Sequence, residues 1–558
     1  MRIRDGSRNG FNEEYNMKKQ SVSNGFAILT VGSMIVKIIS LLYVILITLV
    51  LEKEGYGVYS AVYVIFTFIY VVTNSGISVA TAKVLSELIA KRRYKDTERS
   101  FKLILLFMAL AGLIMSIMMY FFAVPLSILV KFPKAAIAIK TLSPAIFFTS
   151  ILSVYRGYFQ GSGNMIPTAV SQIIEQLINV ASSMLFAGLL MKYGIEYGCA
   201  GATVGTSFGA FVSIIYMMCI YKKNKITISN EEELQFTNRS FSAKILMKKI
   251  LKYAIPITIC LGMQNAGSLI DMANVKDRLL VGGFSESIAS TLFGVISQFN
   301  TLISVPITII SALSMALLPS ISASNILGEG KEIQRKIIYS FRICLIIAIP
   351  SAIRLAILGK PIYDMLFPKM AEGYKFMVFG SIIVVLWSIV LIQTTILQGI
   401  GKLYKATMYI LVGIIFKVFI NYNVVSIHNI NIYGALLGNI TYFIIPLILN
   451  HMLLRRTLKI KLSLFRISLK PLISALIMGI MIYPSQYLLL KLFELFGNTY
   501  LSNALSTFLT IILGGFIYVY ILALTKGIDD QDLGLIPPSI IKLIPKVILK
   551  KIKKKRCN

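Results

Sequence analysis

The chain has 558 residues, of which 56% are hydrophobic and only 14% are charged. Soluble domains carry about 25% charged residues, so this composition excludes an ordinary soluble enzyme and a disordered chain. The charge is unbalanced, with 56 Lys and Arg against 24 Asp and Glu. In a membrane protein such an excess usually marks cytoplasmic loops that face anionic lipid.

Long apolar segments follow one another along nearly the whole sequence. A helix needs about 20 apolar residues to cross a bilayer core about 30 Å thick. Because the backbone in lipid has to satisfy its own hydrogen bonds, these segments are predicted to be helices, and the fold class is an all-α polytopic membrane protein. About fourteen transmembrane helices are expected, at 26–50, 58–89, 101–130, 135–158, 165–191, 199–221, 250–273, 290–320, 338–358, 373–398, 405–424, 432–454, 469–491 and 501–525.

The segments between the expected helices divide the chain into parts. Lys and Arg concentrate in alternate loops, which places both termini in the cytoplasm. No loop is long enough for a separate catalytic domain. The predicted parts are a cytoplasmic tail (1–23), a first lobe of six helices (24–221), a cytoplasmic linker (222–249), a second lobe of six helices (250–454), a basic loop with two further helices (455–525), and a basic cytoplasmic tail (526–558).

Three pairs of short stretches repeat at an offset of about 235 residues. The pairs are Phe159–Asn164 with Leu397–Lys402, Gly201–Gly205 with Gly434–Gly438, and Val79–Ser86 with Ser311–Ser320. An even number of expected helices separates the copies, so both have the same orientation in the membrane. Parallel repeats of this kind occur in transporters that bind substrate between two halves, although small residues at four-residue spacing also favour simple helix packing.

Ionisable and amide side chains inside the expected helices are candidates for a functional site, because a charge at the bilayer centre costs about 2.5 kcal/mol or more. Lys and Arg bind phosphate oxygens, whereas Glu and Gln bind sugar hydroxyls. The alternative is structural, namely an ion pair between helices or a long side chain that reaches the membrane surface. The candidates for substrate binding are Lys37, Arg354, Lys417, Lys83, Glu175, Gln172, Gln176, Gln298, Asp271 and Arg278.

Several short stretches occur in a fixed order between about residues 24 and 454, among them Tyr155–Gly161, Ser171–Gln176, Leu317–Ser322 and Asn431–Ala435. With these stretches the chain resembles the stage V sporulation protein B family of polysaccharide exporters. That family is related to lipid II flippases and, more distantly, to multidrug and toxic compound extrusion (MATE) transporters of the same superfamily. The resemblance implies fourteen helices, two MATE-like six-helix lobes around a central cavity, and alternating access for a lipid-linked sugar precursor.

The functional hypothesis is therefore a flippase of the bacterial cytoplasmic membrane. Its substrate is expected to be an undecaprenyl-linked, lipid II-like precursor of cell wall, spore cortex or other polysaccharide. Anionic membrane lipid is an expected partner. The resemblance implies cell-wall or spore-cortex synthesis enzymes as further partners. Nucleic acid is not an expected partner.

Two alternatives stay open. A MATE-type drug or cation antiporter should have an acidic or aromatic cavity, whereas the deep charges here are mainly basic. A membrane polymerase or ligase of the same lipid-linked sugars should have a large outer loop or His–acid clusters. The sequence has no phosphate loop for ATP, and its five Cys without a CxxC pair and two His do not predict a metal or another cofactor.

Overall fold

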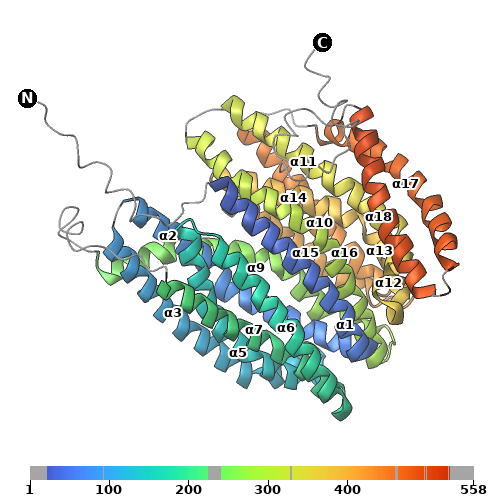
Figure 1. Cartoon of the computed structure of the whole chain (residues 1–558), viewed down its shortest axis with the longest axis horizontal. Helices are drawn as coiled ribbons and strands as arrows, with labels where there is room; N and C mark the ends of the chain where they lie inside the picture. Colours follow the sequence, from blue (N-terminus) through green and yellow to red (C-terminus); the bar gives the residue numbers. More distant parts are fainter. Residues whose placement is uncertain are drawn as a thin grey trace, which may run out of the picture. The chain divides into compact units, whose positions relative to one another are not determined.

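The computed structural model describes residues 22–91, 93–223, 241–326, 330–458, 463–495 and 499–525, together with Gly497 and Gly527. In these residues all regular structure is helical and no strand occurs, which confirms the expected all-α class. Contacts between Cα atoms divide the chain into two compact units (Figure 1). The units are described in turn.

The first unit comprises the described residues of 1–40, 65–127 and 134–262. In Figure 1 its helices run from blue to green. Small residues on α7, among them Gly201, Ala202, Gly205 and Gly209, are buried against neighbouring helices, as is usual where membrane helices pack closely. The helices of this unit, together with part of α1 and part of α9, are η1 (Val71–Ser75), α2 (Gly76–Ala90), α3 (Tyr94–Phe121), most of α4 (Ala123–Leu129), most of η2 (Pro133–Ala135), α5 (Ala136–Gly161), α6 (Ile166–Leu190), η3 (Met191–Tyr193) and α7 (Ile195–Lys223).

The second unit comprises residues 41–64, 128–133 and the described residues from Met263 onward. Its last two helices, α17 and α18, pack on each other, and α17 also packs on α11. The helices of this unit are α10 (Glu286–Ile326), α11 (Gly330–Ile357), α12 (Gly359–Leu366), η4 (Pro368–Gly373), α13 (Tyr374–Gly380), α14 (Ile382–Gly399), α15 (Leu403–Val424), α16 (Tyr433–Leu458), α17 (Leu464–Glu494) and α18 (Thr499–Leu524).

Two long helices are divided between the units. Helix α1 (Val22–Tyr70) contains a break at Glu52, whose φ of 60° and ψ of −170° are not helical. Helix α9 (Ala243–Val281) contains Pro256, which removes one backbone hydrogen bond. The boundary between the units falls after Ser40 and again after Val64 in α1, and after Gly262 in α9. The domain limits expected from the sequence stay a prediction.

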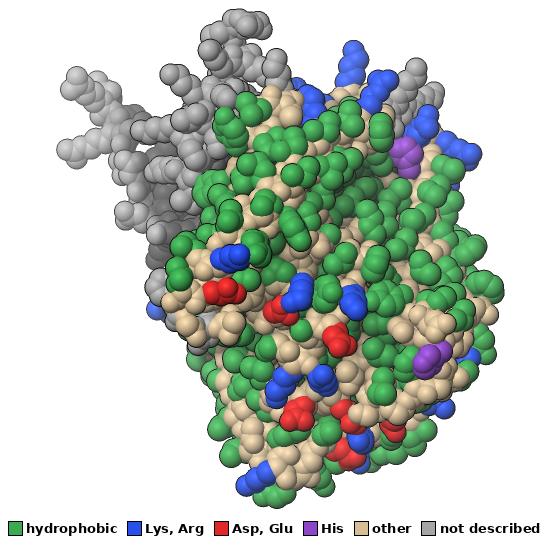
Figure 2. Space-filling model, turned by 90° about the vertical axis from the view of Figure 1, so that its right-hand side faces the viewer, with side chains coloured by type: hydrophobic (Ala, Val, Ile, Leu, Met, Phe, Trp, Pro, Cys, Tyr) green, Lys and Arg blue, Asp and Glu red, His purple; other side chains and the backbone are tan. Residues whose placement is uncertain are grey.

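The outer surface is strongly apolar. On α17, for example, Phe465, Ile480 and Leu495 are 72%, 74% and 83% exposed. Figure 2 shows one face of the molecule on which hydrophobic side chains form a broad field, with charged side chains of both signs gathered in its lower part. A field of this kind is expected where helices face hydrocarbon, and it is far larger than the apolar patches of soluble monomers.

Among the described residues, twelve helical segments are long and apolar enough to cross a membrane. One of them, Val31–Ile89, has 59 residues and contains both the first and the second expected spans. The seventh expected span, 250–273, lies in α9, which is not among the twelve. The structure therefore confirms a polytopic all-α membrane protein, whereas the number fourteen stays a prediction.

The predicted internal repeat has matching local geometry in the two units. Helix α5 ends where Gly163 adopts a φ of 81°, and α14 ends where Gly401 adopts a φ of 74°. The hydrogen bonds at the two ends are equivalent: Asn164 N donates to Phe159 O at 3.0 Å, and Lys402 N donates to Leu397 O at 2.7 Å. This is the glycine-terminated helix end that exploits left-handed backbone.

The second pair of repeated stretches brings glycine against a polar side chain in both units. A Cβ atom on Gly205 of α7 would collide with the side-chain oxygen of Ser183 and the main-chain oxygen of Asn179. A Cβ atom on Gly438 of α16 would collide with the Oδ1 atom of Asn421. The helix pairs α6–α7 and α15–α16 thus approach closely at corresponding places.

We expect Gly205→Ala to lower the free energy of unfolding by about 1–3 kcal/mol, because the added methyl group overpacks the α6–α7 contact. Gly188→Ala is the matched control, since no heavy atom lies within 4 Å of a Cβ atom at Gly188. The control should be neutral or stabilising by up to about 1 kcal/mol. Thermal unfolding of the purified variants in one detergent measures both, and equal stability of the two variants would contradict the close contact.

Candidate functional site

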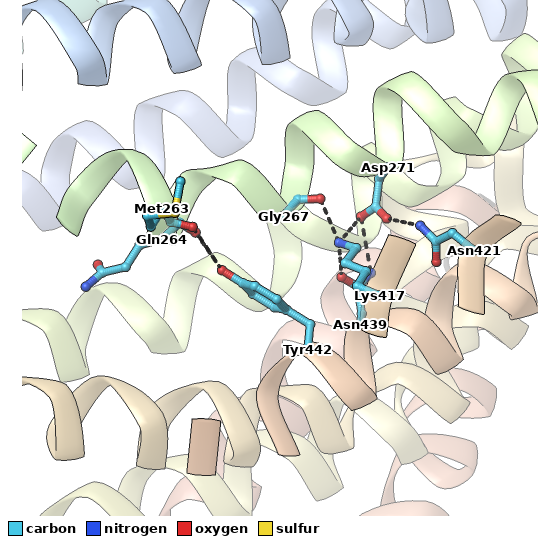
Figure 3. Close-up of polar contacts among 8 residues, drawn as sticks. All are labelled: Met263, Gln264, Gly267, Asp271, Lys417, Asn421, Asn439 and Tyr442. Atoms are coloured by element: carbon cyan, nitrogen blue, oxygen red, sulfur yellow. Dashed lines mark hydrogen bonds and ion pairs between the residues drawn. The ribbon is translucent and has the colours of Figure 1, made fainter. Parts of the chain in front are cut away.

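A deeply buried pair of opposite charges lies at the centre of a polar cluster in the second unit. Lys417 of α15 and Asp271 of α9 are 1% and 2% exposed, and the Lys417 Nζ atom lies 2.8 Å from Asp271 Oδ2. The same ammonium donates to Gly267 O at 2.7 Å and to Asn439 Oδ1 at 2.6 Å. Figure 3 shows how these groups converge from α9, α15 and α16.

The carboxylate of Asp271 is held from the other side by two amides. Asn421 Nδ2 donates to Asp271 Oδ1 at 2.9 Å, and Asn439 Nδ2 donates to Asp271 Oδ2 at 3.3 Å. Nearby, the hydroxyl of Tyr442 donates to Gln264 O at 3.1 Å, as Figure 3 also shows. Each of the three helices therefore contributes groups that neutralise or orient the Lys417–Asp271 pair.

Helical spacing explains why these residues meet. Gly267 and Asp271 are four residues apart on α9, and Lys417 and Asn421 are four residues apart on α15, so each pair shares one helix face. Gly267 leaves the space that the ammonium occupies, since a Cβ atom there would lie 3.5 Å from Lys417 Nζ and 3.3 Å from the Tyr442 ring. Gly438 lets α16 approach Asn421 in the same way.

The cluster is electrically neutral and nearly saturated with hydrogen bonds. A lysine ammonium has three donors, and all three find oxygen acceptors at 2.6–2.8 Å. In this conformation the ammonium has no donor left for a phosphate group. The exception is Asn421 Oδ1, which is buried without a hydrogen-bond partner. The cluster therefore ties α9 to α15 and α16, which is the structural alternative that the sequence left open.

A second ion pair lies in the first unit. Arg156 of α5 donates from Nη2 to Glu175 Oε2 of α6 at 2.6 Å and from Nε to Ser171 Oγ at 3.0 Å. Both charged side chains are partly buried, with 12% and 23% exposure. The neighbouring Gln172 has a buried Oε1 atom without a hydrogen-bond partner, whereas Gln176 is half-buried. In the structure, the predicted residue Glu175 therefore pairs with Arg156, which is also partly buried among the helices.

Other predicted residues take no part in these two ion pairs. Lys37 is half-buried on α1 and has no ion pair or hydrogen bond to the described residues. Lys83 is exposed, and its Nζ lies 4.0 Å from the centroid of the Tyr253 ring. Arg278 binds the adjacent Asp277 and lies over the Tyr422 ring at 4.1 Å.

Gln298 and Arg354 complete the set. Gln298 is fully buried, where its Nε2 donates to Met370 Sδ at 3.1 Å. Arg354 lies in the last turn of α11, where its Nη2 is 3.8 Å from Met478 Sδ of α17. Within the described residues, no contact links either side chain to the Lys417–Asp271 cluster. Among the predicted residues of the second unit, Lys417 and Asp271 therefore meet, whereas Gln298 and Arg354 contact other side chains.

Comparison with known proteins assigns the chain to a family. The family of polysaccharide biosynthesis proteins matches residues 22–325, more than half of the sequence. The chain belongs to this family.

Individual relatives extend the similarity along the chain. The lipid II flippase MurJ of Bacillus subtilis (strain 168) is 22% identical over 520 residues, which are 89% of this chain and 94% of the relative. The stage V sporulation protein B of the same strain is 23% identical and covers 80% of this chain and 86% of the relative. The resemblance expected from the short sequence stretches is confirmed.

Solved structures of this superfamily have the same fold. A lipid II flippase MurJ in an inward closed conformation matches with a TM-score of 0.63 at 14% identity, over 89% of this chain and 98% of that chain. An inward-facing multidrug resistance MATE transporter matches with a TM-score of 0.60 at 15% identity, over 80% and 98% of the two chains. At such identities the likeness concerns the fold, and it confirms the expected MATE-like architecture.

Several residues of these two clusters are absent from the predicted set, among them Arg156, Asn421 and Asn439. Arg156 lies near the end of the expected span 135–158, and α5 continues beyond it to Gly161. Asn439 directly follows Gly438 inside an apolar helix. The signal that could have found Asn439 is its position beside Gly438, a glycine at a close helix contact. In this chain Asn439 accepts a hydrogen bond from Lys417.

A double-mutant cycle tests the Lys417–Asp271 tie. Lys417→Met and Asp271→Asn should each cost about 3–5 kcal/mol of unfolding free energy, because each leaves one buried charge unpaired. The double variant should recover part of this loss, since no charge remains. Lys360→Met is the control: Lys360 pairs with Asp364 at 2.9 Å but is 65% exposed, so its loss should cost at most about 1 kcal/mol. Strictly additive losses in the cycle would contradict the tie.

Proposed function

We propose that this protein is a flippase that moves a lipid-linked, lipid II-like sugar precursor across the bacterial cytoplasmic membrane by alternating access between its two lobes. The observation that carries this proposal is the similarity to the lipid II flippase MurJ over 89% of this chain and 94% of the relative. The similarity to stage V sporulation protein B and the polysaccharide biosynthesis family supports a role in cell-wall, spore-cortex or related polysaccharide synthesis.

The intramembrane side chains support an anionic, sugar-bearing substrate. Lys37 is a cation that no described residue neutralises, which suits a pyrophosphate group. Glu175, Gln172 and Gln176 lie together on α6, where carboxylate and amide groups suit sugar hydroxyls. We assign the first contact with phosphate to Lys37 and the sugar contacts to the α6 residues, whereas Lys417 and Asp271 hold helices together.

We place the chain in the membrane with both termini in the cytoplasm, as the distribution of Lys and Arg favours. Its basic segments then face anionic lipid, and enzymes that make or polymerise the precursor are its functional partners. We assign it no reaction of its own, so transport depends on an ion gradient, the membrane potential or consumption of the product.

Drug export is the alternative that shares this fold. The similarity to multidrug transporters is 15% in sequence and concerns the fold alone, so it does not favour a drug substrate. Unchanged sensitivity to cationic toxins after deletion of the gene separates the two functions.

The decisive experiment is complementation. A bacterial host whose own lipid II flippase is shut off expresses this chain, and lipid II on the outer leaflet is quantified. We expect restored exposure of lipid II, and a loss of about tenfold or more with Lys37→Ala, since a charged hydrogen bond to phosphate is removed. Lys192→Ala is the matched control, because Lys192 is an exposed cation at the end of a span.

Full membrane expression without any restored exposure would reject lipid II as the substrate. Reconstituted liposomes that translocate no polyprenyl-linked sugar under imposed ion gradients and potential would reject the flippase itself. Equal activity of the Lys37→Ala and Lys192→Ala proteins would reject the role of Lys37.

A further inference from the structure

Arg354 is a deep cation whose charge no described residue balances. Its Nε atom is buried without a hydrogen-bond partner, and its Nη2 atom meets the Sδ atom of Met478 at 3.8 Å, which is a weak acceptor. Within the described residues, no carboxylate forms an ion pair with this guanidinium. By contrast, the buried cations Arg156, Lys276 and Lys417 each pair with a carboxylate.

The guanidinium lies level with the middle of the two last helices. Met478 is close to the centre of α17, which has 31 residues, and Gly514 is near the centre of α18, which has 26 residues. Although Arg354 is in the last turn of α11, the chain continues as α12, whose Pro361 O accepts from Asn503 Nδ2 near the start of α18 at 3.1 Å. The side chain therefore does not reach a helix end, where water would solvate it.

Helix α18 leaves space beside this guanidinium. A Cβ atom on Gly514 would lie 3.8 Å from Arg354 Nε, and one on Gly515 would lie 3.9 Å from Arg354 Nη2 with no other heavy atom within 4 Å. The two helices beside it carry strongly exposed apolar side chains, among them Ile480 of α17 and Phe516 of α18, which are 74% and 48% exposed. A ligand that reaches Arg354 from this side has to be an anion attached to hydrocarbon.

We propose that Arg354 binds the phosphate group of a membrane lipid between α11, α17 and α18. Arginine does not deprotonate in proteins, and its planar fork matches two phosphate oxygens. A phosphate reaches the middle of a bilayer mainly while its lipid passes between leaflets. The ligand is therefore the polyprenyl-linked substrate in transit, and this second part rests on the proposed function.

The test measures the thermal stability of the full-length protein in detergent with four added lipids. These are lipid II, undecaprenyl phosphate, phosphatidylglycerol, and uncharged undecaprenol as the phosphate-free control. We expect the two undecaprenyl phosphates to raise the Tm of the wild type more than undecaprenol does. For Arg354→Met the apparent affinity should fall about tenfold or more, since a charge-assisted contact is lost, whereas Arg354→Lys keeps part of it.

The direction in which Arg354→Met shifts the Tm without lipid separates a binding role of Arg354 from a structural role. Because an unpaired buried charge is unfavourable, Arg354→Met without lipid should melt above the wild type. Lys360→Met, which removes an exposed cation paired with Asp364, should change neither the Tm nor the lipid response. An Arg354→Met protein that melts below the wild type and keeps the full response to phosphate lipids would overturn the proposal.

The lipid series also separates the two parts of the proposal. A response to phosphatidylglycerol as strong as that to the undecaprenyl phosphates overturns the substrate in transit and makes the ligand a resident phospholipid. An Arg354-dependent response to undecaprenyl phosphates in a protein that fails all transport assays supports the phosphate site, and only the proposed function then fails.

Discussion

Charge inside the hydrocarbon is the constraint on which the rest of this structure depends. A buried ion is tolerated where an opposite charge and hydrogen bonds surround it. Lys417 meets this condition completely, with three oxygen atoms at 2.6–2.8 Å, and Arg156 meets it through Glu175 and Ser171. Lys37 and Arg354 have no carboxylate partner in the described residues. This contrast is why we propose Lys37 and Arg354 as ligand-binding cations, and Lys417 and Arg156 as cations that hold helices together.

Close helix packing makes the paired charges possible. Between membrane helices, van der Waals contact and hydrogen bonds replace the hydrophobic effect, so glycine is found where polar groups must meet. Gly205 faces Ser183 in the first unit and Gly438 faces Asn421 in the second. In both copies of the repeat a glycine meets a polar side chain, but the two polar side chains differ. Gly205 meets the neutral Ser183, whereas Gly438 meets Asn421, which donates to Asp271 of the buried ion pair.

Much of the fold was predictable because it follows from hydropathy. Apolar length predicted the helices, and the repeated stretches predicted two copies, in which the structure shows two equivalent helix ends. The site was less predictable, since the sequence indicates which residues are intramembrane but not which helix faces another. Lys417 and Asp271 are 146 residues apart, and no local pattern predicts that they meet. Arg156 was missed as a site residue because it lies near the end of the expected span 135–158, and composition does not show that Glu175 of the next helix faces it.

Two long helices, α1 and α9, are shared by the two units. The first part of α9 is anchored in the first unit by Lys249, which pairs with Glu87 at 2.6 Å. Its second part is anchored by the Lys417–Asp271 pair in the second unit. Pro256 lies between these anchors, where a missing hydrogen bond permits bending. Helix α1 is also shared and is broken at Glu52. Each part of α9 is therefore tied to its own unit by an ion pair, with Pro256 between the two pairs.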